Sequence, residues 1–155
     1  MSELKDRIRA DLTASMKARD VETTSTLRML LTAISAEEVA GKQARELSDD
    51  EVVMVLTREQ KRRREAAGTF ADAGRADRAA AEQAEAEIIA TYLPQQLAAD
   101  ELNALIAEAV SSAAEQGLSG GRAMGAVMKS LKPATAGRVD GAELAAAVKA
   151  ALGLG

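Results

Sequence analysis

The sequence predicts an all-α protein, and its composition is the main reason. Apolar residues make up 47% of the 155 residues, which is enough for a core, yet Phe70 and Tyr92 are the only aromatic side chains. The core must therefore consist of Ala, Leu, Val, Ile and Met. Ala and Leu lead the helix propensity scale, whereas strands favour β-branched and aromatic residues. Apolar residues also recur every three or four positions, which is the spacing of a helix face.

The first two predicted helices form a hairpin. An apolar residue recurs at every fourth position over residues 4–16, with charges between, and a turn is expected at residues 19–20. A broader apolar face follows over residues 27–34, and this second helix frays near Gly41, where a left-handed cap is easy. The short connection predicts that the two helices are antiparallel.

A capping box marks the start of the third predicted helix. The Ser48 hydroxyl and the Glu51 carboxylate, three residues apart, can each satisfy an orphan amide at a helix start. This helix is expected to end near Gly74, and a fourth helix is expected over about 77–91. Pro94 then stops it, because the residue before a proline avoids the helical region.

Two shorter helices are expected next. Residues 100–101 open the first of them, and Gly117 can close it with a left-handed cap. The segment 119–121 separates it from a small helix over about 124–131. Pro133 is expected to end that helix, since proline cannot donate an amide to a helix interior.

The last predicted helix begins at Asp140, whose side chain can cap it, with Glu143 at the matching position. The composition changes near residues 93–97, where the chain becomes richer in glycine. We therefore expect a helical hairpin domain of long helices over residues 1–93 and a small three-helix domain over residues 94–155.

The composition also excludes several kinds of function. The chain has no cysteine and no histidine, so it lacks thiol nucleophiles, zinc-thiolate sites and the usual general base near neutral pH. Its net charge of −4 argues against a molecule that is basic throughout. No apolar run approaches the roughly 20 residues that span a bilayer. A soluble cytoplasmic protein with no cofactor and no membrane segment is expected.

The strongest positive cluster lies in the third predicted helix, where Arg58, Lys61 and Arg62 share a face. One interpretation is phosphate contact, to which arginine forks are suited. The other is a solvated face tied by pairs such as Glu59 with Arg63. The sequence favours the second interpretation, because nearby carboxylates dilute the positive field.

The segment 137–141 also has two interpretations. Gly137 and Gly141 flank a short loop before a helix N-terminus, where phosphates bind, and Arg138 could supply the charge. Asp140 at the capping position would oppose an anion there. A turn that caps the last helix is therefore the favoured interpretation.

Two further clusters are assigned to packing or pairing. Met124, Val127 and Met128 have the spacing of a core stripe, although methionine also suits a partner surface. Gly125 can allow close helix approach. The carboxylates near Glu82 could suggest a metal site, but helical di-metal sites usually add histidine, so no metal is expected and pairing with Arg78 is favoured.

In their order and spacing, these landmarks resemble the GatB/YqeY family over nearly the full chain. In the N-terminal hairpin the matching residues are 19–20 and 26–30, and in the long charged helix and its turn they are 61–65 and 70–75. At the junction of the two domains they are Glu82, Glu85, 92–94 and Leu97. In the C-terminal domain they are 124–125, 127–128, 137–138 and 140–141. The resemblance implies a helical hairpin domain joined to a compact three-helix domain. In GatB, the B subunit of the glutamine-dependent aminoacyl-tRNA amidotransferase, the similar region is a tail that helps recognise tRNA.

The resemblance also implies kinship with carbon–nitrogen ligases that use glutamine as amide donor. The catalytic cradle of GatB has no counterpart here, so we expect kinship without that activity, and no catalytic residue is assigned. The first expectation is an accessory module associated with tRNA or with translation or amidotransferase components. The residues expected to contact phosphate are Arg58, Lys61, Arg62, Lys129, Lys132 and Arg138, and those expected to shape the site are Met124, Gly125, Gly137 and Gly141.

Two other functions remain open. One is a protein-interaction or scaffold domain that binds no nucleic acid, supported by the net acidity and by helices that can present grooves to partner helices. The other is glutamine-dependent amide transfer by the chain itself. This last function has the least support, because no activated nucleophile and no oxyanion site are visible.

Overall fold

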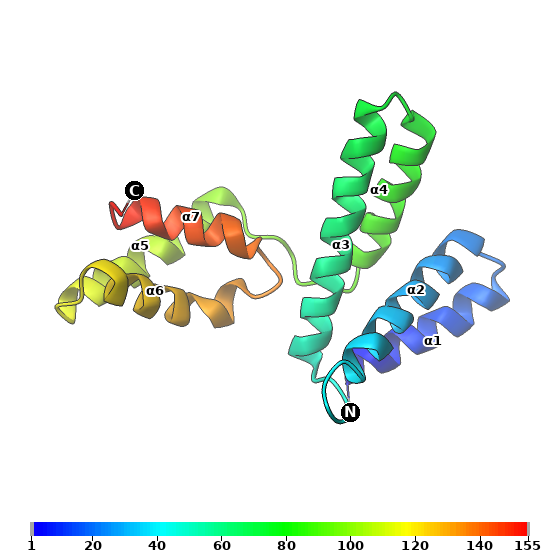
Figure 1. The fold of residues 1–155 in the computed structure, drawn as a ribbon, viewed down its shortest axis with the longest axis horizontal. Coiled ribbons are helices and arrows are strands. Elements are labelled where there is room, and N and C mark those ends of the chain that lie inside the picture. Colours follow the sequence, from blue (N-terminus) through cyan, green and yellow to red (C-terminus); the bar gives the residue numbers. More distant parts are fainter. Residues whose placement is uncertain (1, 155) are drawn as a thin grey trace. The chain divides into compact units, whose positions relative to one another are not determined.

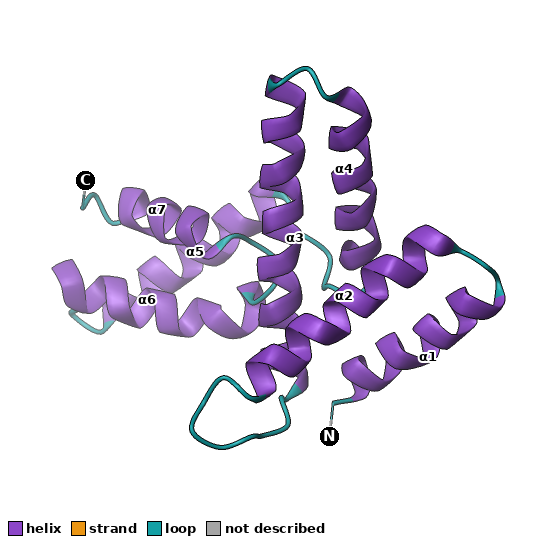
Figure 2. Ribbon diagram, turned by 45° about the vertical axis from the view of Figure 1, so that its right-hand side comes forward, coloured by secondary structure: helices purple, strands orange, loops and turns teal. Residues whose placement is uncertain are grey.

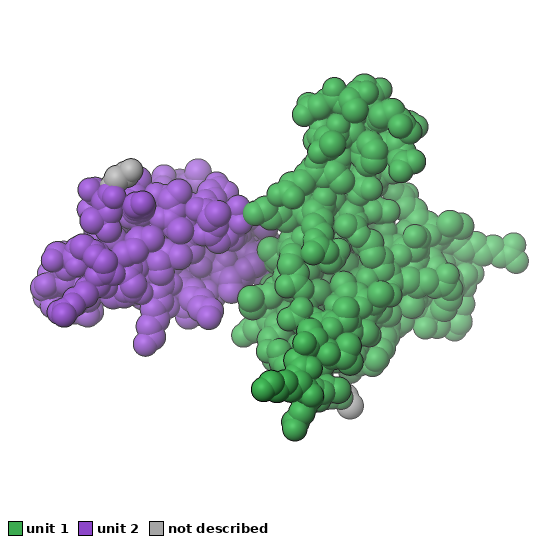
Figure 3. Space-filling model, in the orientation of Figure 1, with its two compact units in different colours: residues 1–93 green, residues 94–155 purple. Residues whose placement is uncertain are grey.

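A computed structural model describes residues 2–154, and the described residues form seven helices and no strand (Figures 1 and 2). The prediction of an all-α protein is confirmed. The chain divides into two compact units, residues 1–93 and residues 94–155, which Figure 3 shows in green and purple. Each unit has its own apolar core.

The first unit consists of two helical hairpins (Figure 1). Helix α1 (Glu3–Lys17) pairs with α2 (Val21–Glu38), and α3 (Asp49–Asp72) pairs with α4 (Ala76–Ala90). Helix α2 also packs on α3 and α4, and α1 packs on α3. The buried apolar side chains of this unit therefore form one shared core: Ile8, Leu27, Leu30, Ile34, Leu47, Val52, Val55, Leu56, Ile89 and Tyr92.

Two local predictions in this unit are confirmed. The Ser48 hydroxyl accepts from the Glu51 amide at 3.2 Å, and the Glu51 carboxylate accepts from the Ser48 amide at 2.8 Å, so the capping box is complete. The turn at residues 19–20 is also present, with Asp20 capping α2 through the Thr23 amide.

A cluster of charged side chains connects α3 to α4. The Arg63 guanidinium lies 3.5 Å from Glu59, 3.1 Å from Glu85 and 3.9 Å from Glu82, and it also contacts the Met29 sulfur of α2. The Arg63 side chain is only 17% exposed and the Glu59 side chain only 8%. The predicted pair of Glu59 with Arg63 is confirmed, and it is part of a larger cluster that one arginine holds together.

The pKa of Glu85 reflects this environment. Burial raises the pKa of the Glu85 carboxyl, and the neighbouring Glu82 charge raises it further, while the Arg63 charge opposes both.

The predicted pairing of Glu82 with Arg78 is wrong. Arg78 lies over the ring of Phe70, 5.1 Å from its centre, and Glu82 lies 3.9 Å from Arg63. The α3–α4 hairpin thus contains more carboxylates than cations at its centre.

The second unit is a three-helix bundle in which all pairs of helices contact one another. Its helices are α5 (Ala99–Glu115), α6 (Gly120–Thr135) and α7 (Gly141–Ala151). The predicted core stripe is confirmed, because Val127 is buried and both Met124 and Met128 pack against the core. The buried residues are Leu102, Ile106, Ala113, Ala123, Val127, Leu131, Leu144 and Val148.

The predicted limits of the α6 helix are wrong at both ends. The helix starts at Gly120 instead of about residue 124, and it continues through Pro133 to Thr135. The first amides of a helix have no intrahelical partner in any case, so glycines there cost little hydrogen bonding. Past the proline, the Thr135 hydroxyl bonds the Leu131 carbonyl at 2.8 Å. Burial of both residues in the core outweighs the one ladder bond that proline removes.

The capping residue of α7 is placed as predicted, but its side chain is not used as predicted. Asp140 is the N-cap residue, and its carbonyl accepts from the Leu144 amide at 2.9 Å. Its carboxylate makes no capping hydrogen bond. Position in the sequence identified the helix start, whereas the side-chain rotamer depends on packing that the sequence does not show.

Candidate nucleic-acid interface

Helix α6 carries three basic side chains and no acidic one. At about 100° per residue, Arg122, Lys129 and Lys132 fall within an arc of about 80°. All three are exposed, while the opposite side of the helix is buried in the core. We call the surface formed by Arg122, Gly125, Lys129 and Lys132 the α6 basic face.

The cations of the α6 basic face are not neutralised by carboxylates. Within residues 2–154, none of Arg122, Lys129 and Lys132 makes an ion pair. The groove residues that α5 contributes beside them are uncharged. Three positive charges on one side of a 16-residue helix therefore form a local positive surface on an acidic protein.

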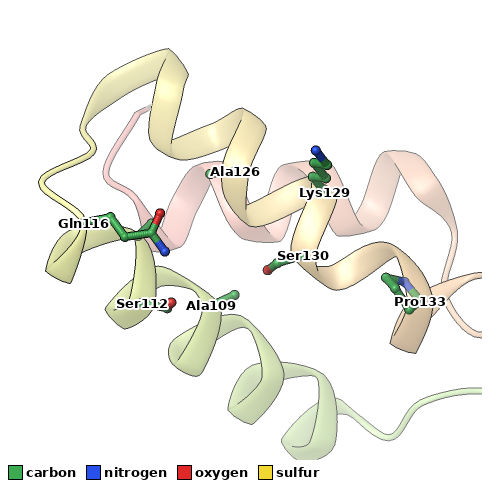
Figure 4. A pocket seen from close by; sticks show the side chains of 8 residues that line it. Ala109, Ser112, Gln116, Ala126, Lys129, Ser130 and Pro133 are labelled. Carbon is green, nitrogen blue, oxygen red and sulfur yellow. The ribbon is translucent and has the colours of Figure 1, made fainter.

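A groove between α5 and α6 borders this face (Figure 4). Its volume is about 370 Å³, and its polar groups are Ser112 and Gln116 from α5 and Lys129 and Ser130 from α6. In Figure 4 the Ser130 hydroxyl turns toward α5, and the Lys129 nitrogen points away from α5. The hydroxyl and amide groups of the groove can bind sugar oxygens, and the Lys129 ammonium outside it can bind phosphate oxygens.

Gly125 lies on the α6 basic face, and it does not serve helix packing. A Cβ atom added at this position would meet no atom within 4 Å, so the expectation that Gly125 allows close helix approach is wrong. Glycine inside a helix costs roughly 0.5–1 kcal/mol relative to alanine. Because Gly125 has no side chain and no neighbour there, the α6 backbone between the cations is accessible to solvent.

The basic residues of α3 are arranged differently. Arg58 pairs with Glu37 of α2 at 3.1 Å, and Arg62 pairs with the buried Glu59 at 3.1 Å. Lys61 is exposed and also has an interaction. The solvated, ion-paired interpretation thus describes Arg58 and Arg62, each of which has a carboxylate partner.

Arg138 connects the segment before α5 to the turn between α6 and α7. Its Nε donates to the Gln95 carbonyl at 2.9 Å, its Nη1 donates to the Ala134 carbonyl at 3.3 Å, and Nη2 lies 4.0 Å from Glu101. The Arg138 carbonyl accepts from the Leu97 amide at 3.0 Å. These contacts occupy much of the guanidinium, so the structure shows a structural role for Arg138.

The glycines of the segment 137–141 have separate roles. Gly137 has a φ of 72°, a left-handed conformation that other residues adopt at a cost, and its carbonyl accepts from the Gln96 amide group at 3.3 Å. Gly141 is the first residue of α7, and a Cβ there would meet open space. Gly137 therefore shapes the turn that Arg138 anchors, whereas position 141 has room for a side chain.

Arg122 is the functional candidate that sequence reasoning missed. The sequence-based start of the α6 helix at about residue 124 left Arg122 outside the helix, whereas the observed start at Gly120 includes it. A spacing of seven residues between Arg122 and Lys129 is two helical turns. That spacing was the available signal, and it required the correct helix start.

No helix among the described residues is long and apolar enough to cross a membrane.

Comparison with known proteins identifies the family. No curated protein matches the chain. A model of the family described as "Yqey-like protein" matches residues 5–152. The chain therefore belongs to the Yqey-like protein family.

Proposed function

We propose that this protein is an accessory RNA-binding module that holds the phosphate backbone of a structured RNA on the α6 basic face, with no catalytic step of its own. The observation that carries this proposal is the alignment of Arg122, Lys129 and Lys132 on one exposed face without any ion pair in the described part of the chain. Phosphate contacts of this kind supply affinity and position without reading sequence.

The scarcity of aromatic side chains supports backbone recognition over base recognition. Proteins that read single-stranded RNA stack its bases on exposed aromatic rings. Here Tyr92 is buried and donates its hydroxyl hydrogen to Asp11 at 2.6 Å, and Arg78 lies over one face of the half-buried Phe70 ring. A folded RNA, recognised by shape and phosphate, is therefore the expected ligand class, and the similarity to the GatB tail makes tRNA the first RNA to test.

The expected affinity depends strongly on salt. Each phosphate neutralised by a cation releases condensed counterions, so three contacts predict a log–log slope of roughly −2 to −3 for the binding constant against salt concentration. Fluorescence anisotropy of labelled tRNA with the full chain, from low to moderate salt, measures this slope. Absence of binding at the lowest salt, or binding that is independent of salt, would contradict the proposal.

A further inference from the structure

The turn between α1 and α2 carries a second exposed surface, which is separate from the α6 basic face. A hollow of about 700 Å³ lies where the end of α1 meets the start of α2. We call it the hairpin surface. It is lined by Met16, Arg19, Val21, Thr24, Ser25 and Arg28.

Apolar and cationic groups alternate on the hairpin surface. Val21 is 79% exposed and Met16 is 43% exposed, and both line the same hollow, so they form one apolar patch. The Arg28 Nη2 lies 3.3 Å from the Met16 sulfur, so one arginine is held against the apolar patch. Methionine and arginine are both enriched at the centres of protein–protein interfaces.

The backbone at Arg19 adopts a conformation that usually belongs to glycine. Arg19 has a φ of 57°, and it is the only non-glycine residue with positive φ among the described residues. Its amide donates to the Met16 carbonyl at 3.2 Å, and the Asp20 amide donates to the Ser15 carbonyl at 3.0 Å. This is the Schellman pattern of a helix end, in which the left-handed position usually belongs to glycine.

The same chain provides the comparison. Helices α3, α5 and α7 end in the same hydrogen-bond pattern, and the left-handed position is Gly74, Gly117 or Gly153 in each of them. Among these four helices, only α1 has a side chain there. Since glycine would adopt this conformation without steric cost, Arg19 carries a backbone cost that the other three helix ends avoid.

The charged residues that line the hairpin surface are both cations, Arg19 and Arg28. Within residues 2–154, Lys17, Arg19 and Arg28 make no ion pair. Asp20 at the turn accepts from the Thr23 amide at 3.2 Å and from the Thr23 hydroxyl at 2.7 Å, and these hydrogen bonds lower the pKa of its carboxyl, so it keeps its negative charge at the start of α2. A ligand that complements the lining therefore combines an apolar group for Met16 and Val21 with negative charge for Arg19 and Arg28.

We propose that the hairpin surface binds an acidic peptide segment of a partner protein. One aliphatic side chain of the segment packs between Met16 and Val21, and flanking carboxylates bind Arg19 and Arg28. An RNA backbone would use the cations but leave the exposed apolar side chains in contact with water, so the mixed surface favours a peptide. This interaction is independent of RNA binding on α6.

The test uses a labelled synthetic peptide with one leucine flanked by two glutamates on each side, titrated with the full chain. Two control peptides replace the glutamates by glutamine or the leucine by serine, and both are expected to bind more weakly. Equal binding of the glutamine peptide, or no binding of the glutamate peptide to the wild-type chain, overturns the proposal.

The Arg19→Gly variant separates binding from folding. It removes the guanidinium and relieves the positive φ, so we expect an equal or higher Tm together with roughly 3- to 10-fold weaker peptide binding. Lys42→Gln, which removes an exposed charge elsewhere, is the matched control and should bind as wild type does. Unchanged peptide binding by Arg19→Gly, or a loss of tRNA binding without loss of peptide binding, would show that the surface does not recognise a peptide.

Discussion

Replacing Arg63 by alanine is expected to destabilise the first unit by about 2–4 kcal/mol at neutral pH. Arg63 is the cation among Glu59, Glu82 and Glu85, at 3.1 to 3.9 Å from each. Its loss leaves Glu82 and Glu85 without their cation, and it leaves the almost fully buried Glu59 with Arg62 as its remaining partner. Breaking such a cluster by removing one partner costs more than the intact pairs contribute, because the remaining charges stay desolvated.

The loss of stability is expected to depend on pH. Because burial raises the pKa of Glu85, the stability linked to this group is present below its unfolded pKa of about 4.3 and is lost as pH rises through its folded pKa. Without Arg63, which lowers the Glu85 pKa, that folded pKa rises further. The effect of Arg63→Ala should therefore be small near pH 4 and full near pH 7.

Urea unfolding of variant and wild type at each pH measures the difference in unfolding free energy. Carboxylates with a lowered pKa, such as Glu38 beside Lys5, make the protein less stable when they are protonated at low pH. This loss is the same in the variant and the wild type, so it cancels in the difference of their unfolding free energies. Adding Glu82→Gln and Glu85→Gln to Arg63→Ala should recover much of the loss, since these changes remove the unbalanced charges. A loss that is below about 0.5 kcal/mol, the range of ordinary surface substitutions, would show that the cluster does not stabilise this unit.

The second large effect is expected on RNA binding. A triple variant of the α6 basic face, Arg122→Gln, Lys129→Gln and Lys132→Gln, should weaken tRNA binding at low salt by on the order of 10- to 100-fold. The salt slope should become shallower by about one for each phosphate that the variant no longer neutralises. The helix should remain folded, because all three side chains are exposed. The salt titration described above measures both quantities.

Two matched triples separate the face from total charge. One carries Arg58→Gln, Lys61→Gln and Arg62→Gln on α3, and the other carries Lys42→Gln, Arg75→Gln and Lys149→Gln. Each of them also removes three positive charges, so an effect of net charge alone would weaken RNA binding by all three variants alike. We expect the α6 triple to lose most of the affinity. An equal loss in all three, or a larger loss in the α3 triple, would contradict the assignment to α6.

Local signals in the sequence predicted much of the fold, and tertiary contacts explain what they missed. The Ser48–Glu51 capping box and the pair of Glu59 with Arg63 lie within one helix turn, so spacing alone identifies them. The α6 limits depend on burial of Leu131 and Thr135, which overrides the local signal of Pro133. Burial against other elements cannot be calculated from neighbours in sequence.

The candidate site was predicted in part for the same reason. Lys129 and Lys132 were singled out, but Arg122 was not, because the glycines before it resembled a loop. The pairing of Arg58 with Glu37 joins residues 21 positions apart, and no periodicity reveals it. The sequence therefore shows which cations exist, while the fold decides which of them are neutralised.

Amide chemical-shift mapping of the isotope-labelled full chain during titration with tRNA tests the central claim most directly. That claim is that the protein works by holding an RNA backbone on one face of α6. We predict that the largest shift changes fall on residues 122–132, with smaller changes at Ser112 and Gln116 across the groove. Changes confined to α3, or no changes at low salt, would contradict it.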